Sequence, residues 1–293
     1  MKRKNNCYTL PWPFDTGKDI INQIFLPGSN VVYDFHGDPC KAELIILMEG
    51  NQFMVIPDLL EAFYDYLGRK VEVFYATLPP PRFRAAIFGE PLAVGNLKLS
   101  LKPQIIMAPP EFMAKISEAI SGPKTFMQNR GVVLITRRGN PKNIQAPEDL
   151  LRPDVKIAIS NPKTEANSYK SYSRALEHVP GLLEKIQKEA LFSSLIHHRE
   201  VPAFVFYGEA DAAPLYFHFA YYYQNPRFFE DPLFDYITFP EGQKGVSHYQ
   251  VALVKGYEED DLARSWYEFL DHPEARAIYA KHGFSKEFSQ IKN

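Results

Sequence analysis

The sequence predicts an α/β protein with two lobes, and three observations lead to this fold class. The chain has 293 residues, which exceeds what one hydrophobic core usually organises. Short apolar runs alternate with amphipathic segments, a pattern typical of a parallel sheet covered by helices on both faces. The alternation starts again after Gly131, and its final segment returns to the first lobe. We therefore expect two lobes, each a mainly parallel sheet flanked by helices, joined by two crossover strands.

The first lobe is predicted over residues 41–130 together with residues 246–293. Its first strand is the apolar run at residues 43–48, which is short enough for a buried parallel strand. A helix follows with apolar residues at helical spacing from Leu59 to Leu67, and Gly68 ends it. The remaining elements are strands at 71–75, 104–107 and 248–254, a short helix at 83–88, a helix from Pro110 through Ile120 closed by Gly122, and two helices between 261 and 282.

The second lobe is predicted over residues 131–245. Its strands are expected at 132–136, 155–159 and 203–207, and its helices at 147–151, 168–178 and 182–190. An acidic turn around Asp211 follows the last of these strands and leads to Tyr216. We expect the Asp211 carboxylate to fix this turn by accepting backbone N–H bonds.

Residues 1–40 are rich in Pro, Gly and Asn, and they predict an N-terminal extension that wraps around the lobes. The start is basic, as in a signal peptide, but residues 5–9 are polar where an apolar core should follow. An exported chain with a trimmed start and a cytoplasmic chain both remain open. Cys7 and Cys40 could form a disulfide in an oxidising compartment or remain two thiols, and the sequence favours neither.

Composition and motifs exclude several classes of function. The net charge of -2 gives no basic footprint, so we expect no nucleic-acid partner. No apolar run is long enough to cross a bilayer. No Gly-x-Ser-x-Gly elbow, Gly-rich phosphate loop or metal-binding Cys/His spacing occurs. We therefore expect a binding protein rather than an enzyme, without a cofactor or a metal.

Four segments occur in the order and spacing of a known family. They are VVLITRRGNPKNIQAPEDL at 132–150, AISNPKT at 158–164, GEADAAPLY at 208–216, and the end of the chain at 251–284, which contains HPEAR. Together they resemble the periplasmic molybdate/tungstate-binding proteins of ABC transporters. The resemblance is good over residues 132–284, weaker over 43–122 and absent before that.

The resemblance implies a type II periplasmic-binding fold and the capture of a small oxyanion in a cleft between the lobes. It also implies an ABC permease/ATPase complex as partner, a monomer, and a periplasmic or extracellular, membrane-associated location. The family holds its ligand with two hydroxyl groups, backbone amides and a tyrosine, of which only the tyrosine is unchanged here. The corresponding ligand-binding residues in this sequence are Asn51, Gln52, Thr77, Asn167, His198, Arg199 and Tyr216.

Elementary physics permits an anion site at these positions, because ligands bind beyond the carboxyl ends of parallel strands and helix amino termini attract anions. The three prolines after Thr77 supply no N–H groups, which departs from an amide-rich anion site. His197 and His198 are adjacent and point in different directions, so we expect no two-histidine metal site. One of them, or Arg199, could contact an anion or lie in a solvated corner.

Other functions remain open. The same fold could bind a small organic anion, either outside the cell or as a cytoplasmic sensor. An enzyme that reuses the cleft is a third possibility. For a cationic ligand or an organic amine, Glu49 and Glu165 would become the relevant residues.

Overall fold

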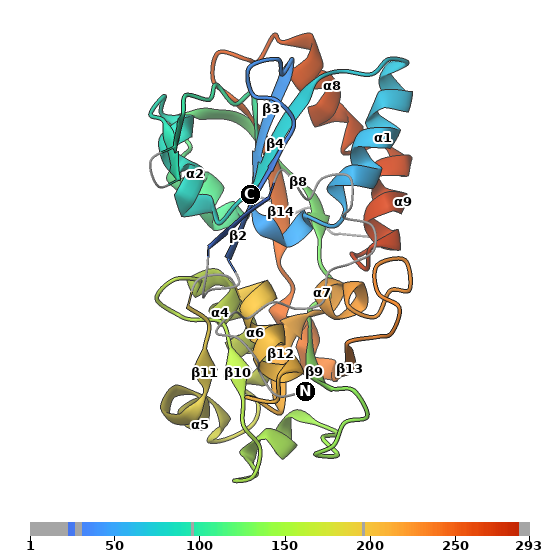
Figure 1. Ribbon diagram of the computed structural model, residues 1–293. Coiled ribbons are helices and arrows are strands. Elements are labelled where there is room, and N and C mark those ends of the chain that lie inside the picture. The colour runs from blue at the N-terminus through green and yellow to red at the C-terminus, as the bar shows by residue number, and fades with distance from the viewer. Residues whose placement is uncertain (1–22, 27–30, 95–96, 195–196, 287–293) are drawn as a thin grey trace. The chain divides into compact units, whose positions relative to one another are not determined.

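The computed structural model describes residues 23–26, 31–94, 97–194 and 197–286. These residues separate into two compact units. We call residues 129–247 the central unit, and residues 33–128 with 248–286 the flanking unit. Each unit contains sheets flanked by helices, which confirms the predicted α/β class (Figure 1).

A seven-stranded sheet has the order β1-β2-β4-β3-β7-β14-β8, and its strands β3, β4, β7, β8 and β14 lie entirely within the flanking unit. Its strands are β1 (Gln23–Leu26), β2 (Val31–His36), β3 (Leu44–Met48), β4 (Val73–Thr77), β7 (Ile105–Ala108), β8 (Ile120–Gln128) and β14 (His248–Val254). The central strands β4, β3 and β7 are parallel, whereas β2, β14 and β8 pair antiparallel with their neighbours. The sheet is therefore mixed. Strand β8 carries the chain towards the central unit and β14 brings it back, so these two strands run in opposite directions.

The predicted N-terminal extension contributes to this sheet, because β1 and β2 lie within residues 1–40. Residues 1–22 and 27–30 of the extension lie outside the described residues. Cys40 is exposed and has no disulfide partner among the described residues. Cys7 lies outside the described residues, so the possible disulfide stays a prediction.

Helices cover the flanking unit's sheet. They are α1 (Ile56–Leu67), α2 (Pro80–Ile87), α3 (Pro110–Lys115), α8 (Asp261–Phe269) and α9 (Pro273–Lys281), with a 3-10 turn η3 (Gly50–Gln52) and a small hairpin of β5 (Leu92–Val94) and β6 (Leu97–Leu99). Gly68 ends α1 in the left-handed conformation, with φ of 68°, as its position predicts. The predicted helix from Pro110 through Ile120 is wrong in its second half, because α3 ends at Lys115 and β8 follows. Strand β8 forms by pairing with β14, more than a hundred residues later in the chain.

An aromatic cluster joins α1 to the C-terminal helices of the flanking unit. Phe63 in α1 meets Trp266 edge to face, with ring centroids 4.9 Å apart, and Phe269 at 5.5 Å. All three side chains are fully buried. Figure 1 shows α1, α8 and α9 along one side of this unit. Burial of these large rings makes the C-terminal helices an integral part of the core.

The central unit is built around strand β9. Strands β12 and β13 pair antiparallel with β9 on either side, and β10 pairs parallel with β11. A parallel bridge from Ile157 to Ala212 connects the two groups. The strands are β9 (Val132–Arg137), β10 (Ala158–Ile159), β11 (Leu191–Phe192), β12 (Ala212–Tyr216) and β13 (Phe234–Ile237). This unit is mixed as well, with its antiparallel pairs centred on β9.

The helical segments of the central unit are η4 (Pro147–Leu151), α4 (Ala166–Leu176), α5 (Leu182–Glu189), α6 (His197–Phe206), α7 (Phe217–Tyr222) and η5 (Pro240–Gly245). The predicted strand at 203–207 is wrong, because these residues form the end of α6. A short apolar run without periodicity cannot distinguish a buried strand from a buried helix. Nearly every residue of α6 is buried, so the helix shows no amphipathic pattern.

The turn before β12 confirms the expected role of Asp211. Its Oδ2 accepts the backbone N–H of Lys156 at 2.9 Å, and its Oδ1 lies 3.6 Å from the Arg137 guanidinium. The side chain is 9% exposed. Asp211 therefore holds the start of β12 against the segment before β10.

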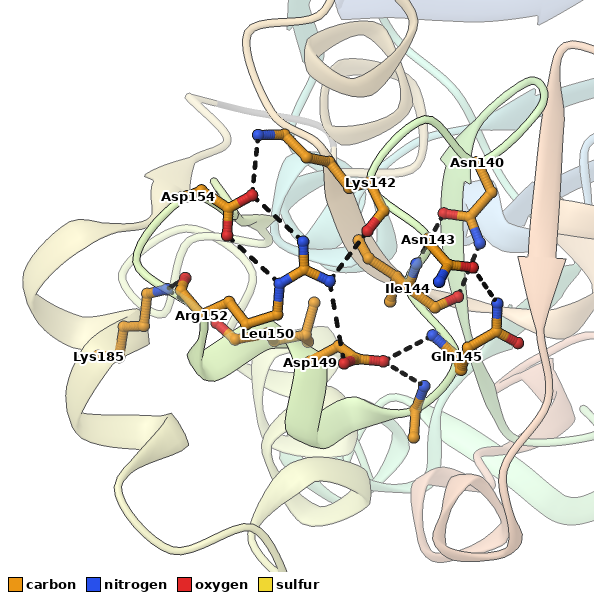
Figure 2. A network of polar contacts seen from close by, with 11 residues as sticks. Asn140, Lys142, Asn143, Ile144, Gln145, Asp149, Leu150, Arg152, Asp154 and Lys185 are labelled. Carbon is orange, nitrogen blue, oxygen red and sulfur yellow. Dashed lines mark hydrogen bonds and ion pairs between the residues drawn. The ribbon is translucent and has the colours of Figure 1, made fainter.

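The motif at 140–150 builds a loop rather than a ligand site (Figure 2). The Asn140 side chain accepts the N–H of Ile144 at 3.0 Å and donates to its carbonyl oxygen at 2.7 Å. Asp149 accepts the N–H groups of the two residues after Ile144, at 2.7 and 3.1 Å. Arg152 donates to a carbonyl of the same loop and forms an ion pair with Asp154. The side chains shared with the resembled family are thus explained by the loop's own hydrogen bonds.

Candidate ligand-binding site

Two of the predicted ligand residues lie at one edge of the flanking unit's sheet. Asn51 is in η3, directly after β3, and Thr77 is the last residue of β4. Strands β3 and β4 are parallel neighbours in which Met48 lies opposite Thr77. Both polar residues are therefore at the carboxyl edge of the parallel strands, where α/β sheets bind ligands. Thr77 is buried and Asn51 is half-buried.

Glu49 lies at the same edge and shapes η3. Its Oε2 accepts the backbone N–H of Asn51 at 2.8 Å, and the residue is 2% exposed. Burial raises the pKa of Glu49 to about 8, although the Asn51 N–H and the Gln52 side chain act in the opposite direction. The carboxyl group therefore holds its proton at neutral pH. A neutral Glu49 does not repel an anion at this edge.

Gln52 is fully buried in the flanking unit. Its Oε1 accepts the hydroxyl of Tyr279, a buried residue of α9, at 2.6 Å. This bond connects η3 to the last helix and uses the carbonyl oxygen of Gln52 within the unit. A direct ligand contact by Gln52 stays a prediction.

The prolines after Thr77 begin α2. Pro79 is the N-cap, and Pro80 and Pro81 are the first two helical residues. Because proline has no N–H group, the start of α2 lacks the amide donors that helix amino termini usually offer to anions. The shortage of backbone donors after Thr77, in which the sequence departs from the resembled family, is therefore also present in the structure.

In the central unit, Tyr216 belongs to a row of three hydroxyl groups. Tyr216 is the last residue of β12, and its Oη lies 3.1 Å from Ser247 Oγ. Ser247 Oγ in turn lies 3.1 Å from Ser171 Oγ in α4. A hydroxyl group can donate one hydrogen bond and accept others without carrying a charge. The row is therefore a set of neutral polar groups of the kind that can bind an oxyanion.

A histidine–carboxylate pair connects the start of α6 with the residue before α4. Nδ1 of His197 lies 2.8 Å from Glu165 Oε1, and its backbone N–H donates to Glu165 Oε2 at 2.6 Å. Ser193 Oγ also donates to Oε2, at 3.1 Å. His197 is 2% exposed, and the Glu165 side chain is 11% exposed.

The other predicted residues of the central unit lie in different surroundings. His198 stacks on Phe219, with centroids 5.0 Å apart and planes 10° apart. Burial lowers the pKa of His198 well below its usual value, and neighbouring positive groups lower it further. His198 is therefore a neutral, packed ring at physiological pH. Asn167 is exposed on the first turn of α4 and Arg199 is half-buried in α6, and the ligand roles of all three stay predictions.

The backbone amides near the start of α6 are already engaged by carboxylates of the chain. Besides the bond from His197 to Glu165, the N–H of Ser194 donates to Glu200 Oε2 at 2.6 Å. The amides of Ser194 and His197 are therefore already engaged within the protein. Sequence reasoning had no spacing signal for the pairing of Glu165 with His197 or of Tyr216 with Ser247, because each joins residues about thirty positions apart.

Within the described ranges, no three His, Cys, Asp or Glu side chains gather as metal ligands would. None of the helices in this part of the chain combines the length and apolarity needed to cross a membrane.

Comparison with known proteins places these observations in a family. Residues 100–285 match the family of bacterial extracellular solute-binding proteins. The chain is similar to the molybdate-binding protein ModA of Mycobacterium tuberculosis, with 25% identity over 175 residues. The similarity covers 59% of this chain and 60% of the mycobacterial protein.

Solved structures share the fold. The periplasmic molybdate-binding protein of Azotobacter vinelandii superposes with a TM-score of 0.62 at 17% identity, over 83% of this chain and 99% of that one. Peb3 from Campylobacter jejuni gives a TM-score of 0.61 at 12% identity, over 84% of this chain and 100% of that one. These likenesses confirm the predicted type II periplasmic-binding fold. The family and the matched relatives are solute-binding proteins, not enzymes. The family match covers more than half of the sequence, and the chain therefore belongs to the bacterial extracellular solute-binding proteins.

Proposed function

We propose that this protein captures a small oxyanion of the molybdate or tungstate type and delivers it to an ABC importer. The observation that carries the proposal is the row of hydroxyl groups formed by Tyr216, Ser247 and Ser171. Neutral donors bind an oxyanion without a second ionised group, and a hydrogen bond to a charged partner contributes about 1.5–3 kcal/mol. The names of the mycobacterial and Azotobacter relatives support the same ligand class.

The flanking unit supports an anion as well. Asn51 and Thr77 can donate through an amide and a hydroxyl group, and the neighbouring Glu49 is neutral at pH 7. We propose that Asn51 and Thr77 in the flanking unit, and Tyr216 in the central unit, are ligand contacts. Asn167, His198 and Arg199 belong to the proposed site as secondary contacts, and Gln52 supports η3 through Tyr279.

A small organic anion is the second candidate. The departure at the prolines after Thr77 and the engaged amides of α6 reduce the number of backbone donors available to an inorganic oxyanion. Peb3, which shares the fold, has been solved bound to L-phospholactate. We propose a periplasmic or extracellular location and a permease/ATPase complex as the partner, in keeping with the family. A monomer is the expected state in solution.

Ligand titration tests the proposal directly. Molybdate, tungstate, sulfate and L-phospholactate are titrated separately into the protein while its tryptophan and tyrosine fluorescence is followed. Saturable binding of molybdate or tungstate is the expected result. Binding of L-phospholactate alone would favour the organic anion, and no response to any inorganic oxyanion would remove the oxyanion assignment.

The Tyr216→Phe variant tests the residue. Loss of this hydroxyl should weaken anion binding by about 0.5–3 kcal/mol, with the upper part applying to a charged and buried ligand. Tyr267→Phe serves as a control, because it removes a hydroxyl that donates to Gly122 in the flanking unit, outside the proposed site. Equal affinities for wild type and Tyr216→Phe would show that this hydroxyl does not bind the ligand.

A further inference from the structure

The second ring nitrogen of His197 is a buried polar atom with no hydrogen-bond partner in the described part of the chain. Nε2 is inaccessible to solvent, and it has no partner among the described residues. The ring is surrounded by aromatic side chains, with Tyr172 at 5.6 Å, Phe219 at 6.0 Å and Tyr216 at 6.1 Å between centroids. Buried polar atoms in proteins are nearly always hydrogen-bonded, so an unpartnered one requires an explanation.

Glu165 determines what this nitrogen can do. The Glu165 carboxylate accepts from Nδ1, so the proton of a neutral imidazole lies on Nδ1 and Nε2 keeps a lone pair. A second proton on Nε2 would convert the ring to an imidazolium, and the adjacent carboxylate favours that charge. Nε2 can therefore bind a ligand oxygen only if one proton lies between the two atoms.

The titratable groups in contact with the His197 side chain are Glu165 before α4, Tyr172 in α4, His198 in α6 and Tyr216 in β12. Arg199 and Glu200 follow in α6, and Arg199 and His218 of α7 act electrostatically on the adjacent His198. Among the contacts of the imidazole with the described residues, the carboxyl group of Glu165 is the one acidic partner within hydrogen-bond distance. His198, the adjacent ring, is packed on Phe219 as a neutral group.

We propose that His197 Nε2 binds the captured anion through a single shared proton, so that binding of a fully deprotonated oxyanion takes up a proton from water. This inference rests on the proposed oxyanion function and deepens it. Before binding, Nε2 carries a lone pair and the oxyanion carries no proton. On binding, a hydronium ion or a buffer acid gives up one proton, which forms the N–H bond at Nε2 and leaves water or the buffer base in solution, and the new N–H donates to a ligand oxygen. Glu165 is the positioning residue that fixes the ring and compensates the imidazolium charge.

The two adjacent histidines have different surroundings, and the sequence alone named only His198 as a candidate ligand residue. His198 contributes its ring to packing and its carbonyl oxygen to a hydrogen bond from Tyr223 at 2.8 Å. His197 has one nitrogen held and one unpartnered, which is the arrangement of a binding imidazole. The Tyr216 ring lies beside it, with the two ring centroids 6.1 Å apart.

Calorimetric titration with sulfate and molybdate between pH 6.5 and 8.5 tests the inference, because both anions remain deprotonated in this range. Each titration is run in two buffers with different ionisation enthalpies, which reports the protons taken up per anion bound. The wild-type affinity should rise as the pH falls, by up to about tenfold per pH unit, with uptake approaching one proton. His197→Gln should lose both the slope and the uptake. Glu165→Gln should retain binding with a smaller uptake.

His178→Gln is the matched control, because His178 also faces a carboxylate, with its Nε2 3.6 Å from Glu241. This variant should keep the wild-type slope and uptake. Nitrogen NMR of the His197 ring in the wild-type protein provides a test that needs no variant, since Nε2 should change from an unprotonated to a protonated signal when the anion is added.

The outcomes are distinguishable. A wild-type protein that binds the anions without proton uptake, or a His197→Gln variant that keeps the wild-type slope, overturns this inference and leaves the proposed function intact. An unchanged Nε2 signal on binding has the same meaning. A wild-type protein that binds neither anion contradicts the proposed function, and the inference fails with it.

Discussion

The buried carboxyl group of Glu49 makes a quantitative prediction about stability. Glu49 is 2% exposed, one of its oxygens accepts the Asn51 N–H, and the other has no hydrogen-bond partner among the described residues. Burial raises its pKa from the ordinary 4.5 to about 8. The folded protein therefore keeps this proton until about pH 8, whereas the unfolded chain releases it near pH 4.5. Between these values the unfolded state binds fewer protons, so the free energy of unfolding falls as the pH rises.

The magnitude follows from linkage. One proton corresponds to about 1.4 kcal/mol per pH unit, so Glu49 removes about 3–4 kcal/mol of stability between pH 5 and pH 8. Glu49→Gln has no proton to lose here, and its amide oxygen can still accept the Asn51 N–H. The stability difference between the variant and the wild type should therefore grow by about 3–4 kcal/mol over this range, in favour of the variant.

Urea unfolding at pH 5, 6, 7 and 8, followed by circular dichroism, measures this difference. Glu61→Gln, on the exposed part of α1, controls for the loss of a carboxylate as such. A Glu49→Gln difference that stays constant within about 0.5 kcal/mol from pH 5 to pH 8 would refute the argument, because Glu49 would then ionise in the folded protein as it does in the unfolded chain.

Two further predictions concern the central unit. Asp211→Ala should lower the free energy of unfolding by about 1–3 kcal/mol, because the Lys156 N–H loses its acceptor. Urea unfolding measures this loss. A loss below about 0.5 kcal/mol, roughly the smallest net value of one hydrogen bond, would contradict the role of Asp211. Gly131→Ala should destabilise more than Gly139→Ala. Both glycines have positive φ, of 85° and 78°, but only at Gly131 would an added Cβ lie 2.4 Å from a carbonyl oxygen, that of Gly242. The unfavourable φ costs about 1–3 kcal/mol in each variant, and Gly131→Ala has the clash with the Gly242 carbonyl in addition. Thermal unfolding of the two variants measures the difference. Equal losses of stability would show that the clash contributes nothing.

Local patterns in the sequence were sufficient for much of the flanking unit. The apolar run that forms β3 and the helical spacing that ends at Gly68 depend on neighbouring residues, so they could be predicted. Elements that form through distant pairing could not. Strand β8 forms by pairing with β14, which lies far away in the sequence. Strand β12 contains Pro214, a residue that is disfavoured in strands except at a sheet edge. In the three-stranded sheet, β12 is an edge strand. The end of α6 was predicted as a strand because its burial removes any periodicity.

In the candidate site, too, features that depend on neighbouring residues could be predicted, and contacts between distant residues could not. The position of Tyr216 could be predicted because it ends a motif of nine residues. Its hydroxyl partner Ser247 could not, since the contact joins residues 31 positions apart. The imidazole of His197 was recognised only as one of a polar pair. Its distinction from His198 depends on Glu165, which hydrogen-bonds the His197 ring, and on Phe219, on which the His198 ring stacks.

The two limits of the central unit are tied together by hydrogen bonds. The N–H of Asn129 donates to the carbonyl oxygen of Ser247 at 3.0 Å, and the Asn129 side chain accepts the N–H groups of Gly131 and Ser247. A segment whose first and last residues touch can be excised as a separate polypeptide, or have its ends fused into a circle, without stretching its backbone. Such a minimal fragment would carry Tyr216, Ser247, His197 and Glu165 in one piece, and would allow their chemistry to be studied by NMR at less than half the mass of the whole chain.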